Sequence, residues 1–523
     1  MLKRASVVFV ALVLVIAALV ASQGLVSFET EQTIAPATAA GVLRLAWGEP
    51  ETLDPALAND VDSLGFLLHI HSGLVRLNND MEVAPALASS WQLSPDGRTY
   101  TFTLREGARF QDGRPVTAAD VKYSLERATD PALKSQVAAT YLGDIVGVRE
   151  KLAGQAGEVQ GVKVIDERTV AITIDEPKVY FLAKLTYPTA SVVDRQNVAS
   201  GADWAKHPNG AGPFKLVSWD KDWIVLERSE YYWGTDPSPR QVEYYIGPRS
   251  PMAMYEGNEL DVIQVGLGDI ERVLDPRGPL HDELVVSSGL SLYYVGLNVD
   301  EEPFQDRAVR RALARAIDKD KIVNVTMKGT VVRADGVLPP GLLGHDPSFR
   351  GLTYDLEAAE NLLKESFYGG PDQLPPITFT GGMGELFAEA YWRNLGVPMV
   401  VQVVQEGYYE GLDARAYQMF LTGWLADYAD PENFLDLLFH SQSQGNHTGY
   451  SNPEVDSLLE QARVEKDEGK RVALYRQVER IVVDDAAIIP LFFDVSYDLV
   501  KPRVHGLDLT PLGIITYEGI TLD

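Results

Sequence analysis

At 523 residues the chain is far longer than one hydrophobic core usually serves, so we expect two or three domains. Apolar residues make up 46% of the sequence, an ordinary share for a folded globular protein. The formal net charge of −28 disfavours binding to nucleic-acid phosphates or anionic lipid, because both need clustered Lys and Arg. The charge does not identify a ligand, because an acidic surface usually serves only to keep a protein solvated and soluble.

The first residues have the pattern of an export signal. Lys3 and Arg4 precede an apolar run over residues 5–20, which is shorter than the roughly 20 residues that a membrane-spanning helix needs. We therefore expect a signal peptide over residues 1–24 and a linker over residues 25–41, with an N-terminal anchor as the alternative to cleavage. In both cases the rest of the chain lies outside the cytoplasm.

The chain contains no cysteine. It therefore has no disulfide, no thiolate metal site and no lipid-bearing cysteine after the signal, which is the residue that anchors bacterial lipoproteins. We expect an extracytoplasmic protein, periplasmic or at the cell surface, that is not a lipoprotein.

Strand and helix patterns alternate along the chain. Residues 99–104 alternate in polarity, as in a half-buried strand. Thr117 and Asp120 have the spacing of a capping box before a helix over residues 118–128. Near the end of the chain, residues 488–493 form an apolar strand. These patterns predict an α/β fold in at least two blocks, without a short internal repeat.

No standard enzyme signature occurs in the sequence: it has no GxxxxGK[ST] phosphate loop, HExxH motif, GxSxG elbow or thiol pair. His69 and His71 are spaced like metal ligands, but they lie in an apolar run with no third ligand nearby, so we interpret them as core residues. We interpret Asp427 and Asp430, beside a proline, as turn formers or a ligand anchor rather than a glycosidase pair. The chain is therefore expected to have no catalytic residue, no metal and no cofactor.

The most specific motif of the chain is a long block over residues 87–128, which reads LASSWQLSPDGRTYTFTLREGARFQDGRPVTAADVKYSLERA. It resembles the signature block of the bacterial extracellular solute-binding proteins of family 5. Residues 209–234, 257–262 and 296–317 extend the resemblance in family order over most of the remaining chain. The resemblance implies an α/β periplasmic-binding-protein-like fold (class II, cluster C) with two lobes joined by a hinge.

The same resemblance implies three domains. Domain I, the discontinuous first lobe, is expected to comprise residues 42–72, 205–298 and 497–523. Domain II is expected to be an insertion over residues 73–204, and domain III, the second lobe, to comprise residues 299–496.

Residues 423–434 (GWLADYADPENF) are most similar to the oligopeptide-binding branch of the family, in which this strand pairs with an extended ligand. The resemblance implies the substrate-binding subunit of an ABC importer, which closes its lobes on an oligopeptide and delivers it to a membrane permease. Partner ATPase subunits would use ATP. The receptor is expected to be a monomer that binds no nucleic acid.

A receptor for varied peptides must hold what all peptides share, namely the main chain and the charged amino terminus. By resemblance, Asp427 is expected to pair with the ligand's α-ammonium group. Trp424 is either a wall of a side-chain pocket or a core residue. The main-chain contacts are assigned to Gly423, Trp424, Leu425 and Ala426. Other ligand-binding candidates are Asn59, Val61 and Asn298, near the groove by resemblance, and the aromatic residues Tyr408 and Phe492, with Phe493 and Tyr294 of the same kind.

One position departs from the family pattern. Oligopeptide-binding relatives can carry an arginine two residues before the matched glycine, where it helps to hold the ligand carboxylate, and Leu421 stands there in this chain. Arg415 is a candidate substitute whose alignment needs a gap. The carboxylate-binding residue and the preferred peptide length therefore stay open.

Other ligands and functions stay open as well. Family members also bind dipeptides, metal chelates, haem, opines or oligosaccharides, so the fold is better fixed than the ligand. The 23 Tyr and 8 Trp residues also suit a sugar-stacking site. A function of another class is a secreted hydrolase, which would turn its substrate over instead of releasing it unchanged. A third is a receptor that reports to a sensor instead of a permease.

Overall fold

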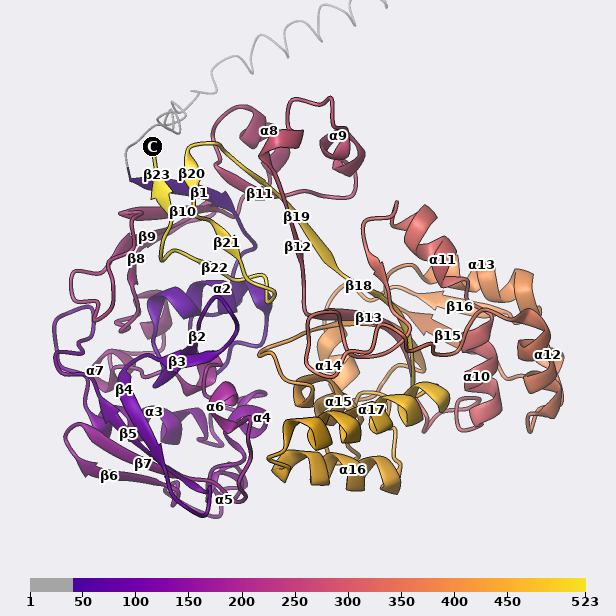
Figure 1. Cartoon of the computed structure of the whole chain (residues 1–523), viewed down its shortest axis with the longest axis horizontal. Coiled ribbons are helices and arrows are strands. Elements are labelled where there is room, and N and C mark those ends of the chain that lie inside the picture. Colours follow the sequence, from indigo (N-terminus) through magenta and orange to yellow (C-terminus); the bar gives the residue numbers. More distant parts are fainter. Residues whose placement is uncertain (1–40) are drawn as a thin grey trace, which may run out of the picture. The chain divides into compact units, whose positions relative to one another are not determined.

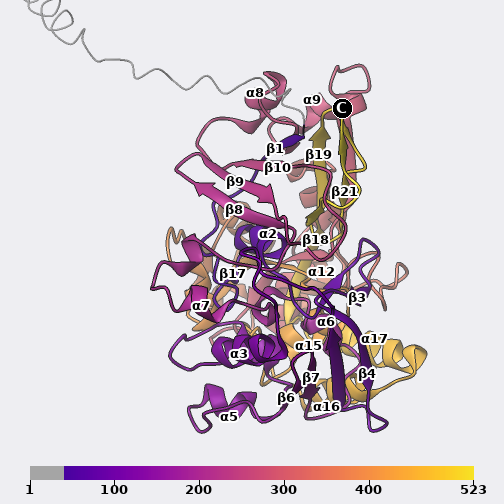
Figure 2. The ribbon, with the colours of Figure 1, turned by 90° about the vertical axis from the view of Figure 1, so that its left-hand side faces the viewer.

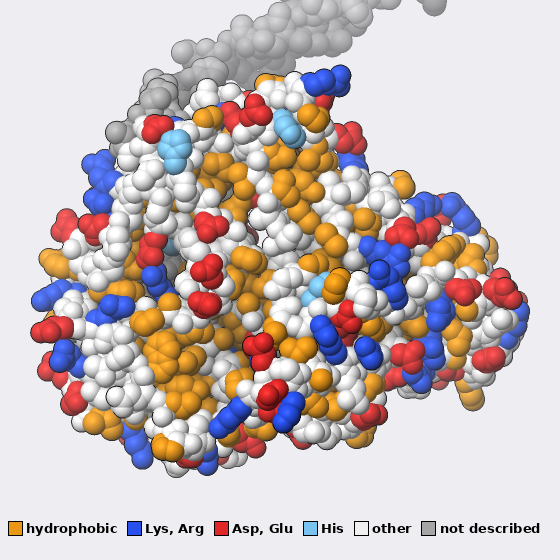
Figure 3. All heavy atoms as spheres, viewed as in Figure 1, with side chains coloured by type: hydrophobic (Ala, Val, Ile, Leu, Met, Phe, Trp, Pro, Cys, Tyr) orange, Lys and Arg blue, Asp and Glu red, His pale blue; other side chains and the backbone are white. Residues whose placement is uncertain are grey.

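The computed structural model describes residues 41–523. The expected signal peptide and all but the last residue of the expected linker lie outside the described residues. Among residues 41–523, no helix is long and apolar enough to cross a membrane. On the face shown in Figure 3, acidic and basic side chains are interspersed rather than gathered by sign.

The first part is built on a seven-stranded sheet in the order β12-β19-β11-β1-β10-β9-β8 (Figure 1). Strand β1 runs parallel to β10 and β11, whereas β9 and β19 run antiparallel to their neighbours. Phe66, Leu67 and Ile70 of helix α2 (Val61–Ile70) are buried in the core on this sheet. The strands are β1 (Val42–Ala46), β8 (Phe214–Trp219), β9 (Trp223–Arg228), β10 (Gln241–Tyr245), β11 (Val262–Gln264), β12 (Leu284–Ser288) and β19 (Val495–Val500).

The second part is a six-stranded sheet in the order β14-β18-β13-β17-β15-β16, with helices on both faces (Figure 1). Because side chains alternate along a strand, Leu292 and Tyr294 of β13 pack with α15, α16 and α17, whereas Val295 and Leu297 pack with α10, α12 and α13. The strands are β13 (Ser291–Leu297), β14 (Val332–Arg333), β15 (Ile377–Thr380), β16 (Met399–Gln402), β17 (Met419–Leu425) and β18 (Ile488–Phe493). The helices are α10 (Arg307–Arg315), α12 (Leu356–Glu365), α13 (Gly384–Leu395), α15 (Glu432–Phe439), α16 (Pro453–Val464) and α17 (Glu468–Asp484).

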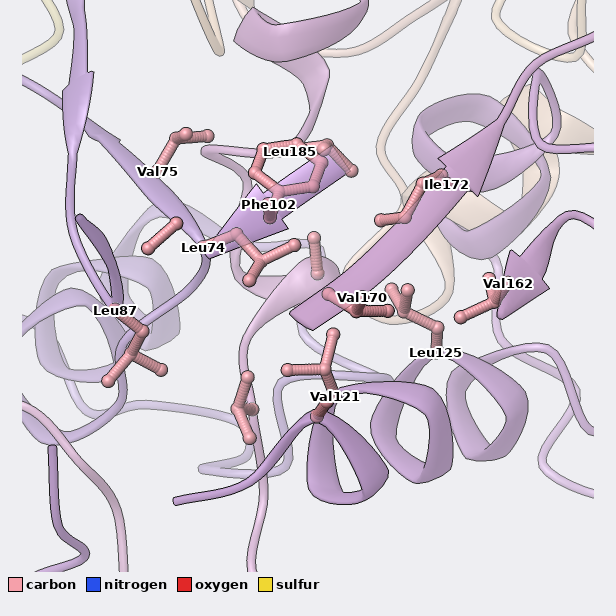
Figure 4. Close-up of a cluster of buried hydrophobic side chains, with 14 of the residues drawn as sticks. Leu74, Val75, Leu87, Phe102, Val121, Leu125, Val162, Val170, Ile172 and Leu185 are labelled. Carbon is pink, nitrogen blue, oxygen red and sulfur yellow. The ribbon is translucent and has the colours of Figure 1, made fainter. Parts of the chain in front are cut away.

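The third part is a four-stranded antiparallel sheet in the order β4-β5-β7-β6, covered by α3. Val121 and Leu125 of α3 point toward Val170 and Val162 of the sheet (Figure 4). The predicted capping box of Thr117 is present at the start of α3. The elements are β4 (Ala88–Leu93), β5 (Thr99–Leu104), β6 (Val162–Asp166), β7 (Thr169–Thr173) and α3 (Ala118–Ala128).

The remaining elements are short and connect or flank these three sheets. They are β2 (Val75–Leu77), β3 (Val83–Pro85), α4 (Ala138–Leu142), α5 (Val148–Leu152), α6 (Phe181–Lys184), α7 (Arg195–Val198), α8 (Pro251–Glu256), α9 (Ile270–Leu274), α11 (Lys319–Lys321), α14 (Tyr408–Asp413), β20 (Val504–His505), β21 (Asp508–Leu509), β22 (Ile515–Thr516) and β23 (Thr521–Leu522).

Two neighbouring strand connections lead from the seven-stranded sheet to the six-stranded one. Strand β12 continues into β13 through Gly289 and Leu290, and β18 continues into β19 through Asp494, as Figure 2 shows for β18 and β19. The two connections touch, because the N–H of Gly289 donates to the carbonyl of Asp494 at 3.3 Å. Strand β13 therefore lies in the second sheet, although its residues fall within the 205–298 range expected for domain I.

Candidate ligand-binding site

Strand β17 has one occupied edge and one open edge. Strand β13 pairs with it along its whole length, from Ser291 opposite Leu425 to Leu297 opposite Met419. On the other side, β15 pairs only with Met419 and Phe420. From Leu421 onward, no strand of the described part of the chain covers that second edge.

The main-chain groups of β17 alternate between these two edges. The N–H of Ala426 donates to the carbonyl of Leu290 at 2.8 Å, on the β13 side. Because successive residues of an antiparallel strand turn their main-chain groups to opposite sides, Gly423 and Leu425 turn theirs to the open edge. Gly423 is exposed, and neither residue has a main-chain partner on that edge within residues 41–523.

Glycine at position 423 is also favoured by the packing of the sheet itself. A Cβ atom at Gly423 would lie 3.1 Å from the ring of Tyr293 on β13. That ring stacks in turn on Phe492, with 4.9 Å between the ring centroids. The absence of a side chain at Gly423 therefore permits both the packing of Tyr293 and a close approach to the open edge.

Asp427 lies two residues beyond Leu425, the last residue of β17. Its Oδ2 accepts hydrogen bonds from the hydroxyl of Tyr141 and from Nδ2 of Asn433, the latter at 3.1 Å. No Lys or Arg among the described residues forms an ion pair with this carboxylate. Both hydrogen bonds from side chains of residues 41–523 end on Oδ2, so Oδ1 has no donor among them. Burial raises the pKa of Asp427 to about 6, although the two hydrogen bonds lower it. The site therefore holds a carboxylate that lacks a cation.

Asn433 fixes both Asp427 and Trp424. It lies in the first turn of α15 and is fully buried. Its Oδ1 accepts from the indole N–H of Trp424 at 3.2 Å and from the main-chain N–H of Asp427 at 3.0 Å. Trp424 is partly buried against the core of the second lobe, so its ring has both a packing and a polar contact. No sequence pattern indicated Asn433, whose only local signal is an amide near a helix start.

Tyr141, which lies in the 73–204 range expected for domain II, contacts this carboxylate, and Tyr187 supports Tyr141. Tyr141 of α4 stacks on Tyr187, with ring centroids 3.7 Å apart and planes 3° from parallel. The hydroxyl of Tyr187 donates to the carbonyl of Ala58 at 3.3 Å. A chain of contacts thus joins the segment before α2 to Asp427, and its two rings were also not identified from the sequence.

The structure brings some predicted residues to this region and leaves others away from it. Asn59 and Val61 flank the N-cap of α2, close to Ala58. Val61 is 51% exposed, and Nδ2 of Asn59 donates to Gln136 at 2.6 Å. Asn298 is buried at the far end of the β13–β17 pair, where its Nδ2 donates to the carbonyl of Arg415 at 3.0 Å. The structure therefore does not place Asn298 beside Asp427.

One of the aromatic candidates lies at the open edge of β17, whereas the others lie in the hydrophobic core. The hydroxyl of Tyr408 donates to the carbonyl of Leu421 at 2.6 Å, so this residue touches the open edge of β17. Phe492 is 4% exposed and packs in the core of the second lobe, as do the buried Phe493 and Tyr294. Arg415 lies before β17, with Nη1 3.6 Å from Asp300.

Asp430 and the histidine pair singled out in the sequence lie away from the open edge of β17. Asp430 accepts from Arg471 at 2.5 Å and from the main-chain N–H of Glu432 at 2.9 Å, at the start of α15. His69 and His71 are buried, and burial lowers the pKa of each to about 4. No group of three or more His, Cys, Asp and Glu side chains among the described residues is arranged to hold a metal ion.

A buried cluster of charges also bridges the two lobes next to Asp427. Lys184 of α6 lies 3.1 Å from Asp144 and 3.3 Å from Glu432 of α15. Burial alone would raise the pKa of Asp144, but Lys184 and Lys178 lower it to about 2. Burial raises the pKa of Glu432, and Lys184 opposes this only in part. The two lobes therefore meet through a charged contact as well as through Tyr141.

Comparison with known proteins finds relatives that match nearly the whole length of the chain. The profile of the bacterial extracellular solute-binding proteins, family 5 (middle part) matches residues 82–446. The dipeptide-binding protein DppE of Bacillus subtilis is 31% identical over 502 residues, which cover 89% of each chain. The periplasmic oligopeptide-binding protein OppA of Escherichia coli is 31% identical over 517 residues and 94% of each chain.

Solved structures share the fold. The murein tripeptide binding protein MppA of Escherichia coli superposes with a TM-score of 0.82 at 26% identity, covering 92% of this chain and 98% of that one. OppA of Burkholderia pseudomallei gives a TM-score of 0.81 at 27% identity, covering 92% and 99%.

Proposed function

Because the chain belongs to the bacterial extracellular solute-binding proteins of family 5, we propose that it is the peptide-binding subunit of an ABC importer. The chain is thus a solute-binding protein and not an enzyme, and it has the α/β fold of the periplasmic peptide-binding proteins. The curated relatives named above bind dipeptides or oligopeptides, which supports a peptide as the ligand.

The observation that carries the proposal is the open edge of β17 followed by Asp427. Gly423 and Leu425 offer main-chain groups at the spacing of alternate strand residues, and the carboxylate comes two residues later. A peptide added as a strand at this edge satisfies those groups whatever its side chains are. Its amino terminus then lies at Asp427, so the ligand runs antiparallel to β17.

Asp427 supplies the charge that the ligand's ammonium group needs. Removing an ammonium group from water costs several kcal/mol unless a carboxylate and further hydrogen bonds compensate. The carboxylate of Asp427 is already largely shielded from water, which is why its pKa is raised to about 6 in the absence of a cation. An α-ammonium group at Oδ1 lowers this pKa again, so each charge stabilises the other.

The two strand connections are the hinge in this proposal. Within residues 41–523, the chain passes between the seven-stranded and six-stranded sheets only at Gly289 with Leu290 and at Asp494. We propose that the lobes rotate about these residues to close on the ligand, and that the connections mark the limits of domains I and III. Domain II keeps its proposed range of residues 73–204. Main-chain recognition at β17 and the Tyr141 contact are then made together only in the closed form.

Family members are extracellular or periplasmic binding proteins, and this coarse location holds for the chain. The finer proposal is export by a signal peptide over residues 1–24, without lipid attachment because no cysteine is present. The receptor then works as a monomer that hands its ligand to a membrane permease driven by ATPase subunits.

The test is to identify the natural ligand. The exported protein is purified without denaturant, its bound material is released by unfolding, and that material is identified by mass spectrometry. A heterogeneous set of short peptides is expected, since main-chain recognition does not select side chains. A single sugar, chelate or haem would overturn the peptide proposal, and a hydrolysed product would overturn the receptor role as well.

A further inference from the structure

The open edge of β17 ends at Leu421. Its carbonyl is the third in the series that includes Leu425 and Gly423, and the hydroxyl of Tyr408 already occupies it at 2.6 Å. The turn at Gly381 runs alongside, because a Cβ atom there would lie 3.2 Å from the carbonyl oxygen and 3.4 Å from the nitrogen of Leu421. One acceptor position of the Leu421 carbonyl is thus taken, and the Gly381 turn lies close to both main-chain groups of Leu421 on the side that a ligand would approach.

Tyr408 is held in place from two sides. It is the first residue of α14 and follows Gly407, which has a left-handed φ of 72° and turns the chain into the helix. Its ring stacks on Tyr417, with centroids 5.3 Å apart and planes 19° from parallel. The ring also packs against the buried core of the second lobe. The hydroxyl therefore cannot leave Leu421 by a simple side-chain rotation.

These contacts fix how many ligand residues the edge can pair. In an antiparallel ligand whose first residue faces Leu425, with its ammonium group at Asp427, the third residue faces Gly423 and the fifth faces Leu421. Resting on the function proposed above, we propose that Tyr408 and the turn at Gly381 set the ligand length, so that the site selects peptides of three or four residues.

Shorter peptides lose main-chain contacts at this edge, and longer peptides bring a main-chain group there that finds no partner. A dipeptide has no third residue and forgoes the contacts of Gly423. A pentapeptide brings a polar main-chain group to Leu421, where the carbonyl is taken and the Gly381 turn stands in its path. Leu421 offers no charge to attract the ligand carboxylate, so the edge provides no compensating contact for the extra residue.

The length series of alanine peptides tests this inference because it varies main-chain length at constant side chain. Binding of tri-, tetra-, penta- and hexa-alanine is measured by calorimetry on the protein freed of its natural ligand. The wild type is expected to bind tri- and tetra-alanine alike and penta-alanine at least about tenfold more weakly, the scale of one unmade main-chain hydrogen bond.

Tyr408→Phe keeps the ring and removes only the hydroxyl. It frees the Leu421 carbonyl, so it is expected to strengthen penta-alanine binding roughly two- to tenfold and to leave tri-alanine binding unchanged. Tyr409→Phe is the matched control, because that neighbouring side chain is 71% exposed; it is expected to behave as wild type. Tyr408→Ala, which removes the ring too, is expected to widen the length range further.

The outcomes separate the two proposals. Wild-type protein that binds penta- and hexa-alanine as tightly as tri-alanine, with no change in Tyr408→Phe, overturns the length limit and leaves the peptide receptor standing. Folded protein that binds no alanine peptide of any length overturns the proposed function, and the length limit with it. Length selection in the wild type that persists in both Tyr408 variants removes Tyr408 from the role.

Discussion

The hydroxyl of Tyr141 in the first lobe donates a hydrogen bond to Oδ2 of Asp427 in the second. The two residues are 286 positions apart in the sequence, and each is held by a second contact, Tyr141 by the ring of Tyr187 and Asp427 by Asn433. In the proposed mechanism, closure of the lobes therefore completes the environment of the carboxylate. It leaves Oδ1 of Asp427 as the free acceptor for a ligand cation.

Replacing Asp427 with Asn is expected to weaken tri-alanine binding by at least about a hundredfold. The change removes the charge that compensates the buried ammonium group, which is a loss of about 3–5 kcal/mol. Calorimetric titration measures it. Asp413→Asn, at a carboxylate that is half exposed on α14, is the control and should bind as wild type. An Asp427→Asn protein with unchanged affinity would remove this residue from the ligand site.

The same residue predicts how binding depends on pH. Its pKa is raised to about 6 by burial in the ligand-free protein, and a bound ammonium group lowers it. Only the ionised carboxylate is expected to hold the ligand, so affinity should be constant between about pH 6.5 and 7, where the ligand's α-ammonium group with its ordinary pKa of about 8 stays protonated. Affinity should fall about tenfold per pH unit below pH 6, until the pKa of the bound form is reached. Calorimetry between pH 5 and 7 measures this, and Asp427→Asn should show a flat profile over that range.

Asp427 also carries a cost to stability in the absence of ligand. Because its folded-state pKa lies above the ordinary value of 3.8, ionisation favours the unfolded chain, and stability is lost as the pH rises from about 4 through 6. We expect Asp427→Asn to stabilise the ligand-free protein by about 1–2 kcal/mol at pH 7.5 and by much less at pH 4. Thermal unfolding at both pH values checks this. A lower melting temperature for the variant at pH 7.5 would contradict it.

Local sequence patterns predicted much of the fold, because the interactions behind them are local. The strand predicted over residues 99–104 and the helix over 118–128 have those bounds in the structure, and the capping box of Thr117 is confirmed. Family membership was also predicted correctly, since residues 87–128 lie wholly inside the matched region. These are cases in which a few neighbouring residues determine the outcome.

The contacts that shape the site could not be read from such patterns. Asn433 and Tyr141 act on Asp427 only because α15 and α4 meet it in space, and neither has a distinctive neighbourhood in the sequence. Strand β13 follows β12 after two residues yet pairs in the other sheet, a choice set by packing rather than by its own apolar residues. Asn298 illustrates the same limit, because its polar contacts lie at the opposite end of that strand.

The charged contact between the lobes gives the last prediction. Lys184 is buried between Asp144 and Glu432, so Lys184→Met leaves Glu432 without a cation and Asp144 with Lys178 alone, and is expected to destabilise the protein by up to about 3–5 kcal/mol. Glu432→Gln is the matched change on the other lobe. It leaves Lys184 paired with Asp144 and removes a carboxylate whose pKa burial already raises, so its effect should stay within about 1 kcal/mol. Chemical denaturation of both variants measures the difference. Equal destabilisation by the two would show instead that the lobes are held together by the single Lys184–Glu432 pair.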